Sequence, residues 1–398
     1  MKKEKYITAM FPYPSGSGLH CGHWYNYALT DSYCRLQKYL GFDVFQPFGY
    51  DSFGKPAEDY AIKVGRDPKE VTEENIENFR KEIGRMNTGF DEVLCTHSNY
   101  YQFINRSCWE VLNILRLVYK KNGAIYLKIT DYKQRLIDDL ETVDYPESTK
   151  VEQINWLNNI HDWEVSRDRK WGCPIPNTDL TFDTFFDSSH YTIQYCFFRG
   201  IKAKPVDLYV GGHEHATRHL IYARFITKAL FDIGQIDFNE PFLKVIHQGM
   251  ITKDGEKMSK TKGNTVSLED YDSDTIRFYL MFMGHYFEGG EWSDERVKGI
   301  ERFINRWVKW VSESGTDKIE FKPFEKKIID YTEDFKFNKV VSEFMTFYKI
   351  NKDKRLEQGQ LDKLNKLLSV YMPGIKGKIY GELGRVRKER DREQDINV

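Results

Sequence analysis

The sequence predicts an α/β protein built on a parallel sheet, followed by a smaller unit made of helices alone. A short apolar strand, a glycine-rich turn and an amphipathic helix follow one another near the start of the chain, and the same order returns near residue 206. This order of elements is typical of parallel sheets. After about residue 296 the apolar pattern stays helical. We therefore expect two domains, over residues 1–295 and 296–398.

The first strand–turn–helix unit opens the chain. Residues 5–13 have the pattern of a buried strand that ends at prolines, and glycines follow at 16 and 18. The pattern is helical from His20 to Leu40, and Val44–Phe48 is a second strand. Strand, helix and strand in this order predict a βαβ unit.

The later elements follow from the same patterns. Two further helices are expected before residue 123, and residues 123–205 are mixed, with several short strand-like stretches. The second strand–turn–helix unit comes next, and then a segment rich in glycine and lysine. The predicted ranges are helices 69–87 and 99–122, strand Val206–Val210, turn Gly211-Gly212, helix Glu214–Phe231 and the glycine–lysine segment 243–266.

Composition excludes several classes of protein. With 40% hydrophobic and 30% charged residues the chain is expected to be globular, and no apolar run approaches the ~20 residues of a membrane span. Without a signal-peptide pattern, we expect a cytoplasmic location and no membrane partner. The net charge of −1 excludes a broadly basic nucleic-acid surface. The six cysteines include no Cys-x-x-Cys pair, so we expect reduced thiols, no structural zinc and no other bound metal centre.

One constellation of residues lies at the start of the first predicted helix. His20 and His23 are three positions apart, hence on one helix face, and they follow a glycine-rich turn. Free backbone N–H groups and the positive end of the helix dipole favour a phosphate there. Glycine at position 22 lets a nucleotide approach the backbone. The alternative is that one or both histidines are only packed.

Two other constellations fit the same ligand. Lys257 and Lys260, flanked by glycines, suit a loop that closes on a polyphosphate, although solvated lysine loops are common. Glu214 follows Gly211-Gly212, and its carboxylate can accept hydrogen bonds from ribose hydroxyls; the alternative is that it only stabilises a helix N-terminus. The basic stretch Lys376–Arg392 is either a solvated helix face or a phosphate-contacting tail.

These motifs, in this order, resemble the class I aminoacyl-tRNA synthetases, whose HIGH and KMSKS signatures match His20–His23 and Lys257–Thr261. The surrounding residues resemble leucyl-tRNA synthetase of the bacterial type, from about residue 6 to 310. The matching segments are Phe11–Gly16, Gly22-His23, Gly49–Glu58, Ser166–Gly172, Asp187–Ser189, Gly211–Ala216 and Gln248–Met250. The resemblance implies a Rossmann-like catalytic domain over residues 1–295 with a connective insertion at about 123–205, and a reduced α-helical bundle with a basic tail over 296–398.

The resemblance also implies roles for individual residues. His20 and His23 would stabilise the transition state at the α-phosphate, and Lys257 and Lys260 would hold the leaving pyrophosphate. Asp51 would bind the ammonium group of the amino acid. ATP, with Mg²⁺, would contact Gly22, Gly212, Glu214, Gln248 and Met258; an aliphatic side chain would contact Phe11, Tyr13, Phe185, Tyr191, Tyr209 and His215; and the acceptor end of tRNA would contact Arg167 and Arg169.

The sequence departs from this family in three places. Only six residues separate Trp156 from Trp163, near the point where leucyl enzymes carry an editing domain, so that domain is absent. The family's C-terminal part is usually larger, so the chain is expected to be truncated there. Lys55 and His190 replace a leucine and a tryptophan of the family. They either admit a more polar amino acid or only repack the surroundings of the pocket.

We therefore expect a monomeric ligase that activates leucine, or a similar amino acid, with ATP and transfers it to tRNA without editing. A first alternative is a specialised paralogue that supplies an activated amino acid to a biosynthetic acceptor. A second is a catalytically silent binding or regulatory paralogue, against which the complete histidine and lysine motifs argue.

Overall fold

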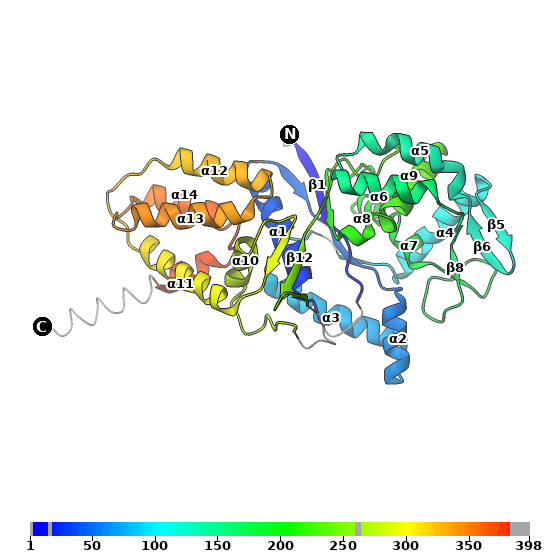
Figure 1. Ribbon diagram of the computed structural model, residues 1–398, viewed down its shortest axis with the longest axis horizontal. Helices are drawn as coiled ribbons and strands as arrows, with labels where there is room; N and C mark the ends of the chain where they lie inside the picture. The colour runs from blue at the N-terminus through cyan, green and yellow to red at the C-terminus, as the bar shows by residue number, and fades with distance from the viewer. Residues whose placement is uncertain (1–2, 15–17, 92, 259–263, 383–398) are drawn as a thin grey trace, which may run out of the picture.

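A parallel sheet runs through the middle of the molecule. The computed structural model describes residues 3–14, 18–91, 93–258 and 264–382 (Figure 1). Four strands pair in the order β11–β10–β1–β2, all parallel. Their bounds are β1 Glu4–Ala9, β2 Asp43–Phe45, β10 Leu208–Gly211 and β11 Val245–His247. The α/β fold with a parallel sheet, expected from the two strand–turn–helix units, is confirmed.

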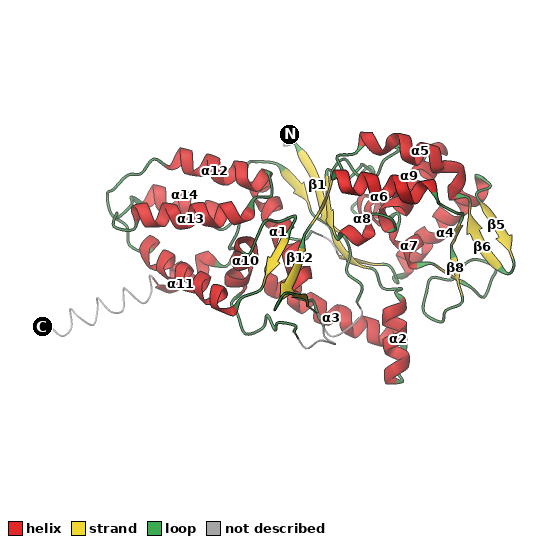
Figure 2. Cartoon of the chain, viewed as in Figure 1, coloured by secondary structure: helices red, strands yellow, loops and turns green. Residues whose placement is uncertain are grey.

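Each face of this sheet belongs to a different apolar core, because successive side chains of a strand point to opposite faces. Tyr6 and Tyr209 belong to one core, and their neighbours Ile7 and Leu208 to the other. Figure 2 shows the two bodies of helices, with α10–α14 on the left of the sheet and α4–α9 on its right. Helices of these bodies are α4 Asn99–Ile114, α5 Lys133–Asp138, α6 Glu147–Asn158, α7 Thr184–Ser188, α8 Tyr191–Phe198, α9 His219–Asp232, α10 Ser273–Phe282, α11 Asp294–Val311, α12 Phe321–Glu333, α13 Phe337–Asn351 and α14 Gln358–Leu368.

The first βαβ unit forms as expected. Helix α1 (Cys21–Tyr39) connects β1 to β2, and Gly41 follows it with a φ of 96°, a backbone conformation that favours glycine. A further parallel pair, β3 with β4, forms a separate two-stranded sheet, and two helices lie between these strands in the sequence. The bounds of these four elements are β3 Phe48–Tyr50, α2 Lys55–Val64, α3 Pro68–Met86 and β4 Val93–Cys95.

One expected helix is too long. The structure ends α4 at Ile114, eight residues before the predicted end, and Arg116 then takes a φ of 57°, in the left-handed region that ends many helices. The chain continues with a hairpin of β5 (Val118–Lys121) and β6 (Ala124–Leu127), and Asn122 and Gly123, with φ of 51° and 82°, form its turn. Asn-Gly between alternating apolar residues is a strong hairpin signal, because both turn positions need positive φ. The predicted helix therefore includes the first strand of this hairpin.

The connective region is a small unit with no inserted domain. Strands β5, β6 and β7 form an antiparallel sheet, and β8 pairs with β9. Only residues 159–162 connect α6 to β7, near the position at which the resemblance to leucyl enzymes would place an editing domain. The bounds of these elements are β5 Val118–Lys121, β6 Ala124–Leu127, β7 Trp163–Glu164, β8 Ser166–Arg167, β9 Thr181–Phe182 and the 3₁₀ turns η1 Ile129–Tyr132 and η2 Asp139–Thr142.

The helical bundle is joined to the sheet domain by α10. This helix packs against α1 on one side and against α11 and α13 on the other. Its Arg277 is fully buried and pairs with Asp31 of α1 at 2.7 Å. The basic residues after 382 lie outside the described residues, and no described helix is both long and apolar enough to cross a membrane.

Candidate active site

The two histidines stand together at the N-terminus of α1. His20 is the N-cap, and its backbone N–H donates to Nδ1 of His23 at 3.2 Å. Their rings stack with centroids 3.8 Å apart. Burial and the neighbouring His20 hold the pKa of His23 well below 6.5, so this ring is neutral at pH 7. Because Nδ1 accepts a hydrogen bond, the proton sits on Nε2 and can be donated to an anion.

The glycines near this site are required by close contacts. A Cβ atom on Gly22 would lie 3.0 Å from the ring of His20, and one on Gly211 would lie 2.1 Å from Sδ of Met10. On Gly212 a Cβ atom would lie 2.3 Å from the carboxylate of Glu214, which therefore folds back over this glycine. The glycines at the end of β10 are thus required by the packing of Met10 and by the position of the Glu214 carboxylate.

The structure corrects the start of the second helix. Residues His213–His215 form the 3₁₀ turn η3, and the α-helical pattern begins only at α9. Hydrogen bonds from His215 to Gly212 and from Ala216 to His213 have the three-residue spacing of a 3₁₀ turn. Glu214 is therefore exposed on a turn at the carboxyl edge of the sheet, where ligands bind in open α/β sheets.

Tyr13 brings two predicted subsites together. The backbone N–H of Asp51 donates to the carbonyl oxygen of the neighbouring Pro12 at 3.1 Å. The ring of Tyr13 lies 6.5 Å from that of His215, the residue after Glu214. Burial raises the pKa of Tyr13 well above 10, and the charge of Asp51 raises it further. Asp51, which is expected to bind the ammonium group, and the turn that is expected to bind ribose thus both lie beside this short segment. An amino acid and a nucleoside bound there would be neighbours.

Aromatic rings form the wall expected for an aliphatic side chain. Phe11 stacks on Tyr191 at 3.7 Å, and Tyr191 stacks on His219 at 5.2 Å. The hydroxyls of Tyr191 and Tyr209 are hydrogen-bonded to each other. Phe185 lies further along, with its ring 5.8 Å from Tyr222.

Sequence reasoning missed two residues that fix this wall. His219 is buried, and its Nε2 lies 2.7 Å from the hydroxyl of Tyr209. Its Nδ1 lies 3.3 Å from Oγ of Ser188. Two signals were present: His219 follows His215 by four positions, and Ser188 lies within the Asp-Ser-Ser segment.

Asp51 is a buried carboxylate with no cationic partner among the residues that the structure describes. It is 2% exposed, and its Oδ1 has no hydrogen-bond partner in the described part of the chain. Burial, and then the charge of Asp183, raise its pKa well above 3.8. A buried charge is costly unless it is paired. The carboxylate is therefore suited to a bound ammonium group.

We expect the KM for the amino acid to depend on pH through Asp51. The ammonium group binds the ionised carboxylate, and the raised pKa means that protonation removes this partner at higher pH than for an ordinary aspartate, with its pKa of about 3.9. KM should therefore rise as pH falls from 8 to 5.5, measured by ATP–pyrophosphate exchange. Asp51→Asn should raise KM about 10- to 100-fold and remove this dependence. A flat wild-type profile would contradict this role.

The two arginines expected to contact tRNA differ in their surroundings. Arg167 pairs with Asp183 at 2.6 Å and donates to the carbonyls of Glu164 and Ser166, so its guanidinium already has partners. Arg169 makes no ion pair or hydrogen bond with any residue that the structure describes, although its charge helps to lower the pKa of Asp183 against the effect of burial. Arg169 is therefore the more available of the two.

The lysine motif is described only in part. Lys257 is exposed on β13 (Glu256–Lys257), which pairs with β12 (Met250–Lys253) across a turn at Asp254-Gly255. Strand β12 also pairs with β14 (Gly289–Glu291) and packs against α1, so this hairpin begins beside the helix of the histidine pair. Gln248 precedes β12, and Met258 follows β13. Lys260 lies outside the described residues.

The structure separates the two substitutions noted in the sequence. Lys55 is 62% exposed at its side chain and pairs with Asp59 at 2.5 Å, so it lies on the surface of α2. His190 is fully buried and stacks on Tyr101 at 5.5 Å. Neither of its ring nitrogens has a hydrogen-bond partner among the described residues, and burial lowers its pKa to about 3. Of the two, only His190 lies among the aromatic residues behind the pocket.

Comparisons with known proteins agree with this geometry. The family described as tRNA synthetases class I (M) matches residues 5–123, and the family described as tRNA synthetases class I (I, L, M and V) matches residues 106–180 and 177–293. The chain belongs to the class I aminoacyl-tRNA synthetases. Together the two matches span the parallel sheet, the histidine pair and the β12–β13 hairpin that contains Lys257 in this synthetase.

Curated relatives of this synthetase are leucine–tRNA ligases. That of Clostridium kluyveri is 26% identical, and the match covers 76% of this chain and 73% of the relative. That of Clostridium perfringens is 24% identical, with 93% and 84% covered. The C. kluyveri alignment extends over 598 positions, although 76% of 398 residues is only about 302. About half of these positions therefore lie opposite gaps in this synthetase.

Solved structures show the same fold. The LeuRS–tRNA–LeuAMS complex of Agrobacterium radiobacter K84 agnB2 matches this synthetase with a TM-score of 0.87, at 21% identity over 96% of this chain and 85% of that one. Methionyl-tRNA synthetase of Mycobacterium tuberculosis, bound to methionyl-adenylate, matches with a TM-score of 0.75, at 16% identity over 95% and 93%.

Proposed function

We propose that this synthetase activates leucine with ATP to form leucyl-adenylate and then transfers the leucyl group to the 3′ end of a tRNA. The observation that supports it most is that the Pro12-Tyr13 segment contacts Asp51 through a 3.1 Å backbone hydrogen bond and lies with its tyrosine ring 6.5 Å from that of His215, next to Glu214, because this makes the amino-acid and nucleoside subsites neighbours. The leucine–tRNA ligases among its relatives support the choice of amino acid. Rings of Phe11, Tyr191 and Tyr209 offer an apolar wall for a branched aliphatic side chain.

In the first step, a carboxylate oxygen of leucine attacks the α-phosphorus of ATP, and the bond to the bridging oxygen of pyrophosphate breaks. Gly212 and Glu214 hold the ribose, and Gly22 lets the phosphates approach the helix. Nε2–H of the neutral His23 donates to an α-phosphate oxygen as its charge grows. Lys257 and Lys260 neutralise the charge of the pyrophosphate, and Gln248 and Met258 contact the nucleotide. Mg²⁺ bound to ATP would supply further positive charge at the phosphates.

In the second step, a terminal ribose hydroxyl of tRNA attacks the leucyl carbonyl carbon, and AMP leaves with the electron pair of the broken bond. No protein nucleophile takes part, so positioning and charge compensation supply the rate enhancement. Arg169 contacts the acceptor strand, and Arg167 fixes Asp183. The cytoplasmic location, the monomeric state and the domain boundary at residue 295 stay predictions.

The test is amino-acid-dependent ATP–pyrophosphate exchange, run against the twenty standard amino acids and then repeated as a charging assay with tRNA. We expect exchange with leucine and a leucyl-tRNA product. Exchange with leucine but no transfer to any tRNA would favour the paralogue that supplies another acceptor. Exchange with none of the twenty would overturn the proposed activity.

We expect no editing. An apolar pocket distinguishes amino acids that differ by one methylene by only about 1–3 kcal/mol, which is why leucyl enzymes carry a second, hydrolytic site. Residues 159–162 leave no space for that domain here. Pre-formed norvalyl-tRNA should therefore lose its amino acid at the same rate with and without the enzyme. Faster deacylation than in an enzyme-free control would show a hydrolytic site elsewhere in the chain.

A further inference from the structure

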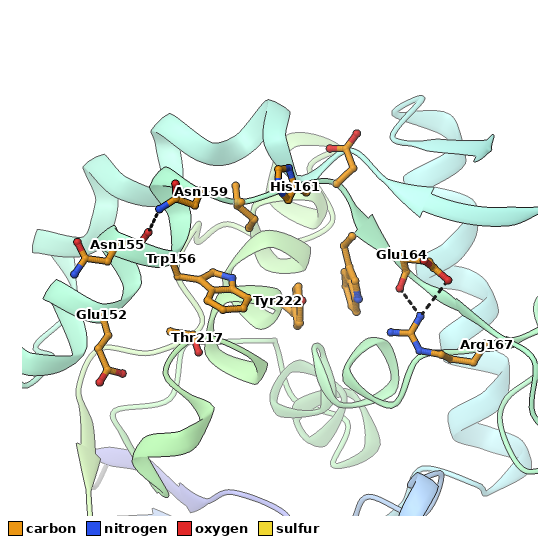
Figure 3. Close-up of a pocket in the computed structure, with 12 residues that line it drawn as sticks. Glu152, Asn155, Trp156, Asn159, His161, Glu164, Arg167, Thr217 and Tyr222 are labelled. Atoms are coloured by element: carbon orange, nitrogen blue, oxygen red, sulfur yellow. Dashed lines mark hydrogen bonds and ion pairs between the residues drawn. The ribbon is translucent and has the colours of Figure 1, made fainter. Parts of the chain in front are cut away.

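A cavity of about 600 Å³ opens where the editing domain is missing (Figure 3). It is bounded by the end of α6, the residues 159–162, the strands β7 and β8, and the start of α9. None of the residues assigned to the amino acid or to ATP lines it. It is therefore a second site beside the catalytic one.

Planar rings form the floor of this cavity. Trp163 stacks on Tyr222 with centroids 3.9 Å apart and planes 14° from parallel. Trp156 is 46% exposed, and Figure 3 shows its indole pointing towards Tyr222. An exposed indole beside stacked rings is the kind of platform on which single-stranded nucleic acids stack their bases, at about 1–3 kcal/mol for each base.

Polar groups surround the rings in a way that suits the edge of a base. Asn155 and Asn159 lie on the Trp156 side of the cavity in Figure 3, and the Asn159 amide donates to the backbone carbonyl of Asn155 at 3.1 Å. Amide side chains both donate and accept hydrogen bonds, as base edges do. Glu152, on the same helix, lies 3.0 Å from Nε2 of His213 and so connects this rim to the turn that holds Glu214.

Two arginines with available side chains lie close in sequence to residues that line this cavity: Arg218 follows Thr217, and Arg169 lies two positions after Arg167. Arg218 is exposed and Arg169 is half-buried, and neither side chain makes an ion pair or hydrogen bond with a residue in the described ranges. The backbone carbonyl of Arg218 accepts a hydrogen bond from the N–H of Tyr222, which lines the cavity, at 3.1 Å. The charge of Arg218 also acts against the rise that burial causes in the pKa values of Tyr13 and Tyr222. Unpartnered guanidinium groups near a base platform are suited to phosphates of a strand.

We propose that this cavity binds an unpaired base of the tRNA acceptor strand, stacked on Trp156, while Arg218 contacts a phosphate of the same strand. The inference rests on the proposed function, because it takes the acceptor to be RNA. Tyr222 lies between Trp163 and Phe185, with ring distances of 3.9 and 5.8 Å, so a base held here is one ring away from the expected amino-acid pocket. The chain that lacks the editing domain thus uses the exposed end of α6 to guide the acceptor strand.

The test compares Trp156→Ala with the wild type in two measurements. The first is binding of an RNA minihelix with an unpaired 3′ end, and of the same duplex with that end removed, by fluorescence anisotropy. Removal of the unpaired end should weaken binding to the wild type about 10-fold and binding to Trp156→Ala by less than 2-fold, because both changes remove the same contact. Trp156→Phe should retain most of the wild-type difference. Phe103→Ala, which removes another exposed ring from α4, should behave as the wild type.

The second measurement separates this inference from the proposed function. Leucine-dependent exchange should be unchanged in Trp156→Ala, whereas leucyl transfer to tRNA should fall about 10-fold. An equal fall in both would show that Trp156 is structural. If removal of the unpaired end weakened minihelix binding equally in Trp156→Ala and in the wild type, the cavity proposal would be overturned even if leucine is activated. AMP or CMP that binds through Trp156 as tightly as the minihelix would make this a free-nucleotide pocket instead. A Trp156-dependent minihelix contact in a protein that shows no exchange would support the cavity and overturn only the proposed activity.

Discussion

Replacement of His23 by alanine is expected to lower the rate of adenylate formation about 100-fold or more, with little change in KM for leucine. The ring is neutral, and its Nε2–H, which donates to no residue in the described ranges, is available as a donor at the N-terminus of α1. Removal of one donor to a transition-state oxyanion costs about 10²–10³ in kcat. The measurement is leucine-dependent ATP–pyrophosphate exchange at saturating ATP.

A matched control is His97→Ala, which removes another half-buried histidine with a lowered pKa, paired at 3.7 Å with Glu73. Its exchange rate should stay near the wild-type value. If His23→Ala also kept a near-normal rate, the histidine pair would have only a packing role at the start of the helix.

Replacement of Arg277 by methionine is expected to lower the free energy of unfolding by about 3 kcal/mol or more. Its guanidinium is fully buried and contacts Asp31 at 2.7 Å, Oγ of Ser32 at 2.9 Å and the carbonyl oxygens of Ala28, Met86 and Tyr371 at 3.2 Å. Methionine fills a similar volume but leaves the carboxylate of Asp31 with Arg35 as its remaining cation. Urea unfolding followed by fluorescence would measure the loss.

The sign of the pH effect follows from the same pair. Burial acts to raise the pKa of Asp31, but Arg277 and Arg35 overcome this effect and hold the pKa below 3.8. The pair therefore stabilises the fold at neutral pH. This contribution is lost as the pH falls through the lowered pKa. Lys326→Met, which breaks an exposed pair with Asp330, is the control and should leave stability nearly unchanged. A loss no larger than that of this control would show that the buried pair is not a stabilising contact.

Short-range patterns predicted much of this fold. The apolar strand, the glycines and the helical period between His20 and Leu40 predicted α1 within one residue at each end. They could not predict Arg277, because its partners come from segments up to 249 positions away. The predicted end of α4 is eight residues too late because the predicted helix includes strand β5, although the helix ends before Arg116, which has a φ of 57°.

The candidate site shows the same limit. Motifs identified His23, Asp51 and Glu214 as separate residues, and only the fold brings Asp51 and the turn that holds Glu214 to the Pro12-Tyr13 segment. The cavity beside Trp156 has no sequence signal of its own, since its rings come from α6, β7 and α9. The roles of the individual residues remain predictions that the variants above address.

The alternation of side chains along β1 has a consequence for dissecting the molecule. Tyr6 and Ile7 belong to different cores, so the two bodies of helices pack against opposite faces of the same sheet. If either body were expressed alone, one apolar face of the sheet would be exposed to water, and a large exposed apolar surface promotes aggregation. A truncated protein that is meant to retain the activation site should therefore keep the helices that cover both faces of the sheet. Alternatively, a soluble fusion partner must cover the exposed face.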